Sequence, residues 1–395
     1  MDPLAPRRRA ALQAVADALA AVGANLTIAA PGGPPIVVGA QPDLARVSFR
    51  DAGAIAALAR RDHLALAEAF LGERVDVDGD MREVIKVTEL LALDESRLGR
   101  LRFAVALALR GRRALARESV ALHYDRPPEF FLPWFERWRS YSHGFYSTPD
   151  DDPTAAQARK LQSAIDALGL RPGMRVLDIG AGWGSFIEYA GLQGIHVHGL
   201  TISREQQRFV AALIRERGLP CTIELVDFFA YRPTEPFDGA VFMGSFEHVL
   251  DYGYAARFLA AHLRPGARAW ADFCAAREVV AGRGSRFMRK WIWPGTVNYV
   301  DVPALLRALL DAGLEVHELA DDTLSYAWTV RDWARALERS RKPLAARFGE
   351  PAVRAFLVFL WGSHHFLASH RTQAYHLVAG RGPRERHSLR DARGA

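Results

Sequence analysis

The stretch from Arg175 to Phe186, Arg-Val-Leu-Asp-Ile-Gly-Ala-Gly-Trp-Gly-Ser-Phe, constrains the fold more than any other part of this chain. Residues 176–179 predict a short buried strand, and residues 185–192 predict a helix. Gly180, Gly182 and Gly184 lie between the two at alternate positions. Because glycine has no Cβ, it admits positive φ and lets a ligand approach the backbone closely. The stretch therefore predicts a strand–turn–helix unit whose turn contacts a ligand.

The glycine spacing distinguishes this turn from a dinucleotide site. A dinucleotide fingerprint reads Gly-x-Gly-x-x-Gly, whereas this turn reads Gly-x-Gly-x-Gly, with Asp178 two residues ahead of it. A carboxylate at the end of the strand suits a cationic or hydroxyl-bearing ligand better than a pyrophosphate. The pattern resembles motif I of the class I S-adenosylmethionine-dependent methyltransferases. The alternative is another glycine-rich α/β turn.

Predicted strands and helices alternate through the second half of the chain, which is the pattern of a doubly wound domain. We therefore expect an α/β fold, in which a Rossmann-like, doubly wound, seven-stranded class I methyltransferase domain follows a smaller N-terminal α/β domain. The strands expected in the larger domain are Val176–Ile179, His196–Leu200, Thr222–Leu225, Gly239–Met243, Ala267–Phe273 and one near Leu314–Leu319.

A length of 395 residues favours two domains. We divide the chain into an N-terminal lipid-binding-like domain (1–95), a basic linker (96–122), the methyltransferase domain (123–380) and a disordered tail (381–395). Aromatic residues are dense between Trp134 and Tyr146. They predict a lid over an apolar substrate, the alternative being that they belong to the core.

The predicted linker carries most of the local positive charge. Seven arginines and no acidic residue lie between Arg97 and Arg117, and apolar residues are interleaved with them. Such a segment can lie on a membrane that contains anionic lipid. A solvated linker helix is an equal alternative. Nucleic acid is not expected as a partner, because no recognition motif accompanies the charge.

Composition limits the compartment and the cofactors. The chain has only two cysteines, Cys221 and Cys274, so we expect no disulfide framework and a reducing compartment. Asp76, Asp78 and Asp80 lack the rest of an EF-hand loop; we interpret them as turn and cap residues and expect no metal. The longest uncharged run is broken by glycines and prolines and predicts no membrane span. We expect a cytoplasmic protein that is peripheral to the inner face of the membrane.

Polar residues follow the next two predicted strands, at the edge where open α/β sheets bind ligands. Thr201, Ser203 and Gln206 follow the second strand and can hydrogen-bond hydroxyl groups. Asp227 and Phe228 follow the third, where an acid can accept from an adenine amine and a ring can stack on it. Phe246-Glu-His-Val249 follows the fourth strand.

Taken together, these motifs resemble the cyclopropane-fatty-acyl-phospholipid synthase family, which includes the mycolic acid cyclopropane synthases. The resemblance extends over nearly the whole chain, and no single motif carries it. The remaining matching motifs are Leu66-Ala-Glu-Ala-Phe-Leu-Gly-Glu73, His123-Tyr-Asp125, Tyr141-Ser142, Trp291-Ile-Trp-Pro-Gly295 and Tyr326-x-x-Thr-Val-x-x-Trp333.

The resemblance implies an activity and a cofactor. The alkene of an unsaturated fatty acyl chain of a phospholipid would attack the sulfonium methyl of S-adenosylmethionine, and loss of a proton from the new methyl group would close a cyclopropane. A carbocation cannot form beside water, so the pocket must be apolar. Aromatic faces stabilise a cation by roughly 0.5–2 kcal/mol each. The resemblance adds Tyr141 and Ser142 to the cofactor-binding residues given above. A homodimer is an open alternative to a monomer.

The resemblance also implies a bicarbonate ion as the base. In the family it is held by a cysteine after the Tyr-Ser pair, the glutamate of the Phe-Glu-His block, a histidine after the fifth strand and a late tyrosine. Glu247 and Tyr326 match, whereas His143 replaces the cysteine and Asp272 takes the place of the histidine. An aspartate repels bicarbonate. Asp272 or His143 is therefore expected to act as the base, or the matching position lies one or two residues away.

Two other outcomes stay open. A hydride shift and proton loss would give a methyl- or methylene-branched chain instead of a ring. A small-molecule N- or C-methyltransferase is a further alternative, as is a lipid-binding relative without catalysis, although the retained glycine turn and Glu247 argue against the latter.

Overall fold

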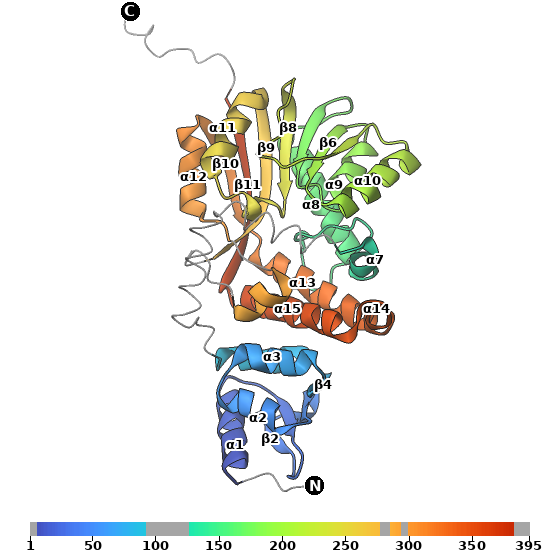
Figure 1. Ribbon diagram of the computed structural model, residues 1–395. Coiled ribbons are helices and arrows are strands. Elements are labelled where there is room, and N and C mark those ends of the chain that lie inside the picture. Colours follow the sequence, from blue (N-terminus) through green and yellow to red (C-terminus); the bar gives the residue numbers. More distant parts are fainter. Residues whose placement is uncertain (1–5, 92–125, 277–284, 294–298, 383–395) are drawn as a thin grey trace, which may run out of the picture.

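The computed structural model of the chain describes residues 6–91, 126–276, 285–293 and 299–382. The predicted linker (96–122), the motif at 123–125 and nearly all of the predicted tail lie outside these ranges. Figure 1 shows an N-terminal unit, a seven-stranded sheet flanked by helices, and a layer of helices between the two.

The N-terminal unit is a four-stranded sheet covered by helices, with strand order β2-β1-β3-β4. Asp76 and Asp78 lie within β4 rather than in a turn, which corrects the sequence-based interpretation, whereas Asp80 caps α4 by accepting from the Arg82 backbone N–H. The elements are α1 (Pro6–Ala21), β1 (Leu26–Ala29), β2 (Ile36–Val38), η1 (Pro42–Leu44), β3 (Ala45–Phe49), α2 (Ala52–Ala59), α3 (His63–Leu71), β4 (Val75–Gly79), α4 (Met81–Ile85) and η2 (Lys86–Glu89).

The larger sheet has the strand order β10-β11-β9-β8-β5-β6-β7. All six predicted strands are present, and the seventh, β11, was not predicted. It lies antiparallel to both β10 and β9, so only the distant pairing reveals it. The strands are β5 (Arg175–Ile179), β6 (His196–Thr201), β7 (Thr222–Leu225), β8 (Phe237–Met243), β9 (Leu263–Ala276), β10 (Leu314–Asp321) and β11 (Thr372–Arg381).

Both faces of this sheet are buried, because successive side chains of each strand point to opposite sides. On β5, Val176 packs toward α8, α9 and α10, whereas Leu177 packs toward α11 and α12. These helices are α8 (Pro153–Leu168), α9 (Ser185–Gly191), α10 (Arg204–Arg217), α11 (Tyr252–His262) and α12 (Val302–Asp311).

The layer between the N-terminal unit and the sheet consists mainly of α13 (Thr323–Arg339), α14 (Arg341–Phe348) and α15 (Glu350–Ala368) (Figure 1). The sequence predicts one helix over 329–346, but the chain breaks near Ser340 because Pro343 lacks the N–H that continuation requires. The short elements α7 (Pro128–Phe131), η3 (Leu132–Trp134), η4 (Phe246–His248) and η5 (Met288–Ile292) complete the described chain.

The aromatic stretch contributes mostly to the core of this layer. Phe131 and Trp134 are fully buried and pack against each other and against Phe356 of α15. Tyr141 packs edge-on against Trp134 and also reaches a cavity. The expectation of a lid therefore applies at most to the later residues of the stretch.

Candidate active site

Two cavities meet at the carboxyl edge of the parallel strands. The smaller one has a volume of about 340 Å³ and is lined by the glycine turn and the ends of β5 and β6. The larger one has a volume of about 690 Å³ and extends from the sheet edge through the helical layer into the N-terminal unit. Tyr141, Gly244 and His248 line both cavities. A ligand in one can therefore approach a ligand in the other at this point.

The glycine turn has the conformation that its sequence predicts. Gly180, Gly182 and Gly184 have φ values of 83°, 54° and 78°, in the left-handed region. At Gly180 a side chain is also excluded by space, because a Cβ there would lie 2.5 Å from the Cβ of Ser245. Ser245 in turn donates a hydrogen bond to the Ile179 carbonyl, which fixes the turn against the loop after β8.

Asp178 is the charged group at the base of the smaller cavity. It is buried, and its Oδ1 has no hydrogen-bond partner among the described residues. Burial, together with repulsion from Asp272, raises its pKa to about 7. An unpaired buried carboxylate is costly, so this atom is available to a cationic or hydrogen-bond-donating ligand that enters the cavity.

The polar residues after β6 form a small network of their own. The Thr201 hydroxyl donates to Gln206 Oε1 at 2.8 Å and accepts from the Ser203 N–H at 3.1 Å. Ser203 also caps α10, because its side chain accepts from the Gln206 N–H. All three residues line the smaller cavity. The network holds the β6–α10 turn in shape at the cavity wall.

The other predicted cofactor-binding residues have different surroundings. Asp227 and Phe228 line the smaller cavity, as do Tyr141 and Ser142. Phe228 also packs edge-on against Phe242 and Phe258, so it is at the same time a core residue. Gly184 does not contribute to the lining; it begins α9 and lies close to Val210.

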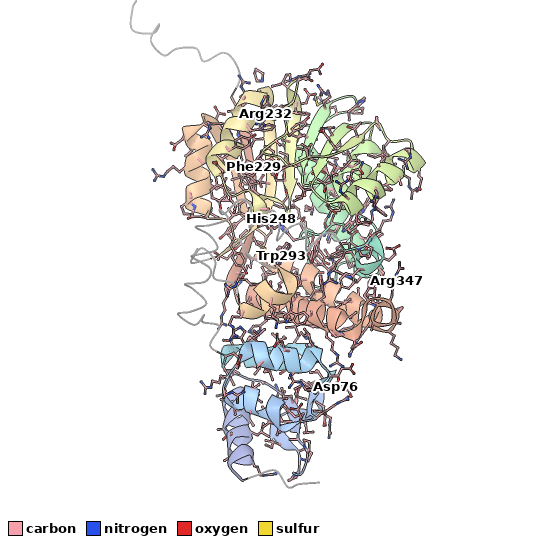
Figure 2. The ribbon with its side chains drawn as sticks, in the orientation of Figure 1. Asp76, Phe229, Arg232, His248, Trp293 and Arg347 are labelled. Carbon is pink, nitrogen blue, oxygen red and sulfur yellow. The ribbon has the colours of Figure 1, made fainter. Side chains whose placement is uncertain are left out.

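Most of the surface that lines the larger cavity is apolar. The N-terminal unit lines it with residues such as Ile28, Phe49 and Phe70, and the helical layer contributes residues such as Val330 and Leu360. Figure 2 shows His248 and Trp293 between the sheet and the helical layer. Their ring centroids are 5.3 Å apart, and His248 lines both cavities. Burial lowers the pKa of His248 to about 4, so this imidazole is neutral near pH 7.

Two of the predicted catalytic residues, Glu247 and Tyr326, line the larger cavity, together with Cys274. The Cys274 N–H donates to Glu247 Oε1 at 2.7 Å, whereas Glu247 Oε2 is buried without a partner among the described residues. Burial raises the pKa of Glu247 to about 7 and raises the pKa values of Cys274 and Tyr326 well above their ordinary range.

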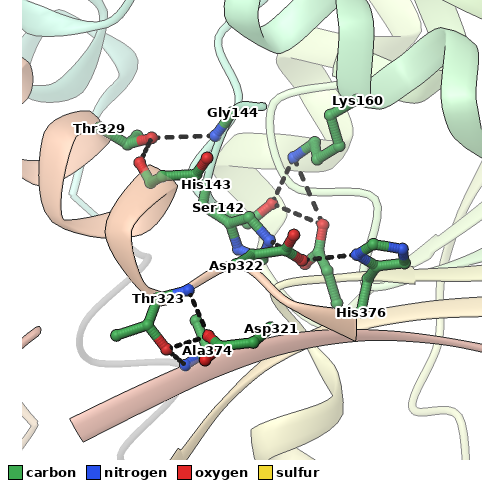
Figure 3. A network of polar contacts seen from close by, with 12 residues as sticks. Ser142, His143, Gly144, Lys160, Asp321, Asp322, Thr323, Thr329, Ala374 and His376 are labelled. Atoms are coloured by element: carbon green, nitrogen blue, oxygen red, sulfur yellow. Dashed lines mark hydrogen bonds and ion pairs between the residues drawn. The ribbon is translucent and has the colours of Figure 1, made fainter. Parts of the chain in front are cut away.

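The other two predicted catalytic residues lie outside both linings. Asp272 is fully buried, accepts from the Gly244 N–H and the Ser142 hydroxyl, and pairs with Lys160 at 3.5 Å. His143 is also fully buried; its Nε2 lies 3.0 Å from Oδ2 of Asp322. Figure 3 shows His143 beside Asp322, and near them Lys160 and Ser142, which are the residues that contact Asp272. The expectation that Asp272 or His143 faces the reacting atoms does not agree with this placement.

The register of the sheet explains why Cys274, rather than Asp272, reaches the cavity. The partner strand β8 ends at Met243, which lies opposite Asp272. Asp272 is therefore covered from the side, and Cys274, two residues farther along the same face of β9, extends beyond the edge. Cys274 is thus the polar side chain of β9 that lines the cavity. Only the pairing of β8 with β9 identifies it.

Comparisons with known proteins agree with this geometry. The model of a family described as mycolic acid cyclopropane synthetase matches residues 112–377. A probable fatty acid methyltransferase from Pseudomonas putida is 28% identical over 311 residues, which cover 75% of this chain and 77% of that protein. The cyclopropane-fatty-acyl-phospholipid synthase of Escherichia coli K12 is 41% identical over 138 residues, but the match covers only 34% of this chain and 35% of that protein.

A solved structure gives the same fold. The mycolic acid cyclopropane synthase CmaA1, complexed with SAH and CTAB, superimposes with a TM-score of 0.61 at 22% identity. The superposition covers 67% of this chain and 97% of that one. The seven-stranded class I methyltransferase fold expected from the sequence is therefore confirmed.

Proposed function

We propose, on the premise that this chain belongs to the mycolic acid cyclopropane synthetase family of S-adenosylmethionine-dependent methyltransferases, that it modifies the cis double bond of an unsaturated fatty acyl chain in a phospholipid. The product is a cyclopropane fatty acid. The observation that carries this proposal is the junction at Tyr141, Gly244 and His248, where an apolar cavity of about 690 Å³ meets the cavity of the glycine turn.

The smaller cavity fits S-adenosylmethionine. Asp178 Oδ1 is a buried acceptor without a partner among the described residues, and Gly180 and Gly182 leave the turn open to a ligand. Bound there, S-adenosylmethionine supplies an electrophilic methyl group. The residues proposed to hold it are Tyr141, Ser142, Asp178, Gly180, Gly182, Thr201, Ser203, Gln206, Asp227 and Phe228. Gly184, which caps α9, is not among the residues that line this cavity.

The larger cavity supplies the conditions that carbocation chemistry requires. Its apolar walls exclude water from the reacting carbons, and the rings of Tyr141, Tyr326 and Trp293 offer π faces to a developing positive charge. Glu247 lines the same cavity, so its carboxylate can compensate the positive charge that develops on the acyl chain. We propose Glu247 and Tyr326 as the catalytic residues.

The N-terminal unit is proposed to hold acyl chain. Leu26, Ile28 and Val47 come from its sheet and line the larger cavity, so a long chain that enters the junction has an apolar path into this unit. The basic segment 96–122 would bring the enzyme to anionic lipid on the cytoplasmic face of the membrane. None of the helices in the described ranges is long and apolar enough to cross a bilayer.

A second candidate product is a methyl- or methylene-branched chain without a ring. The placement of Cys274 beside Glu247 favours it: burial raises the pKa of the thiol, so Cys274 stays protonated and does not take up the proton, which gives a hydride shift time to occur first. A small-molecule N- or C-methyltransferase is a weaker alternative, since a cavity of this size and apolar character exceeds what a compact amine needs.

The test is incubation of the full-length protein with methyl-labelled S-adenosylmethionine and vesicles of dioleoyl phospholipid. We expect label in the lipid fraction, release of S-adenosylhomocysteine, and cyclopropane signals in the proton spectrum of the acyl chains. Vesicles of a fully saturated phospholipid are the matched control. Olefinic methylene or methyl-branch signals would show that the product is the branched chain rather than the cyclopropane. Absence of label in every lipid would contradict the proposal.

A further inference from the structure

Glu247 is the only carboxylate that lines the larger cavity in the described part of the chain. Its two oxygens have different surroundings. Oε1 is held at 2.7 Å by the Cys274 N–H, whereas Oε2 is buried and has no partner there. One oxygen thus fixes the carboxylate to β9, and the other has no partner in the described chain, on a side chain that lines the cavity. Such an orphaned buried acceptor is uncommon unless it has a role with a ligand.

The described groups around this carboxylate carry no positive charge. Cys274 of β9 and Tyr326 of α13 line the cavity beside it, and Asp272 acts on it from behind the wall. His248 follows it on η4 and is neutral near pH 7, because burial lowers its pKa. Arg371, farther along the cavity, is paired with Glu89. The site therefore favours a cation in the cavity and disfavours a second anion.

Bicarbonate does not fit these residues. The family resemblance implies a cysteine after Tyr141-Ser142 and a histidine after the fifth strand to hold the ion. His143 instead points to Asp322 at 3.0 Å and does not line the cavity, and the strand presents the thiol of Cys274. Of the four groups that would hold the ion, only Glu247 and Tyr326 line the cavity, and neither carries a positive charge to offset a buried anion, which is costly in an apolar cavity.

We propose that Glu247 itself accepts the proton released in ring closure, through Oε2, and that this enzyme needs no bicarbonate. The inference rests on the proposed function. The π electrons of the alkene form the first bond to the methyl carbon as the carbon–sulfur bond breaks, with its pair left on sulfur. A C–H bond of that carbon then breaks; its pair forms the second ring bond at the cationic carbon, and the proton passes to Glu247. Exchange with solvent returns the carboxylate after product leaves.

The deciding experiment compares methyl transfer by the full-length protein in CO₂-free buffer under argon, with and without added millimolar sodium bicarbonate. S-adenosylmethionine and dioleoyl phospholipid vesicles are the substrates. We expect the two rates to agree within about 2-fold, and Glu247→Gln to lower the CO₂-free rate by about 100-fold or more, the range for loss of a general base. Calorimetric titration of the protein with bicarbonate should give no binding heat.

Further variants separate a base from a structural role. Glu247→Asp keeps a carboxylate and should restore part of the rate, and the acid limb of its rate–pH profile should move from that of the wild type. Binding of S-adenosylmethionine by Glu247→Gln should equal that of Glu216→Gln, a matched change at an exposed helix position; weaker binding would count against the inference.

The outcomes distinguish the inference from the proposed function. A wild-type rate that appears only when bicarbonate is added would overturn the inference and leave the function standing, as would a Glu247→Gln variant that retains its rate. Absence of methyl transfer to lipid under every condition would instead contradict the proposed function.

Discussion

Asp178 and Glu247 are buried carboxyl groups with the same electrostatic character. The pKa of each is raised to about 7, mainly by burial, from ordinary values of 3.8 and 4.5. The folded chain therefore holds more protons than the unfolded chain between about pH 4 and 7, and the free energy of unfolding falls as pH rises through this window. Each group opposes folding by roughly 2–4 kcal/mol once ionised. The two unpaired carboxylates of the site therefore lower the free energy of unfolding.

The first prediction follows from this sign. Without cofactor, the urea midpoint of the wild type should fall between about pH 4 and 7, and Asp178→Asn and Glu247→Gln should each flatten the fall. Above about pH 7 both variants should be more stable than the wild type by up to roughly 2–4 kcal/mol. The prediction is contradicted if the urea midpoints of the variants change with pH as much as that of the wild type.

Lys160 is a second buried charge, and it carries the second prediction. Its Nζ donates to Ser142 Oγ at 2.6 Å and pairs with Asp272 at 3.5 Å, and both charged side chains are fully buried. Lys160→Met leaves Asp272 unpaired and should lower the free energy of unfolding by about 3–5 kcal/mol. Adding Asp272→Asn should recover part of the loss, as measured by urea unfolding.

The matched control for that pair lies on the surface. Arg208 and Glu205 of α10 are 2.7 Å apart, with 69% and 31% of their side chains exposed. Arg208→Met should therefore cost less than about 1 kcal/mol. Equal losses for Lys160→Met and Arg208→Met would show that burial of the Lys160–Asp272 pair does not matter.

At the scale of single elements, the β5–α9 turn connects fold and function. Gly180 and Gly173 have φ values of 83° and 85°, so an alanine at either site meets the same backbone strain. They differ in space: a Cβ at Gly180 would lie 2.5 Å from Ser245, whereas nothing lies within 4 Å of one at Gly173. The difference between the two variants therefore isolates the shape of the turn.

The third prediction uses this pair. Gly180→Ala should lower the affinity for S-adenosylmethionine by about 10-fold or more, because the turn must move away from the loop after β8. Gly173→Ala should bind within about 2-fold of the wild type and lose only the roughly 1 kcal/mol of backbone strain. Calorimetric titration with the cofactor provides the measurement. Equal affinities of the two variants would mean that the turn does not shape the site.

At the scale of the whole molecule, Arg354 of α15 ties the helical layer to the N-terminal unit. Its Nη1 donates to the Phe70 and Val75 carbonyls at 2.9 and 3.2 Å, and its Nη2 pairs with Asp76 at 2.9 Å. The residue is 2% exposed. Figure 2 shows Asp76 at the boundary between the two parts. Because the larger cavity crosses this boundary, the contact also holds the cavity together.

The fourth prediction concerns this boundary. Arg354→Met removes the hydrogen bonds to the Phe70 and Val75 carbonyls and one of the two ion pairs of Asp76, which keeps Arg50, and should cost about 1–3 kcal/mol. Methyl transfer to lipid should fall, while S-adenosylmethionine binding stays within about 2-fold, since that site lies at the sheet edge. The control is Arg347→Met on α14, whose side chain is 59% exposed. Loss of cofactor binding in Arg354→Met would contradict the prediction.

The sequence by itself determined the α/β class, six of the seven strands of the larger sheet, and the glycine turn with Asp178. These features are local, because hydrophobic period and glycine spacing are written within a few consecutive residues. The strand β11 was missed because it depends on pairing with distant strands. The break near Ser340 was missed although Pro343 is a local signal for it.

Only the tertiary structure decided which side chains reach the cavity. Asp272 and Cys274 lie on the same face of one strand, and the end of β8 at Met243 buries the first and opens the second to the cavity. His143 also lies outside the cavity lining, because its Nε2 contacts Asp322. Two side chains that are two residues apart on a strand point to the same face, so the local sequence does not distinguish them. Which of the two is buried depends on where the neighbouring strand ends, and that is set by pairing with a distant part of the chain.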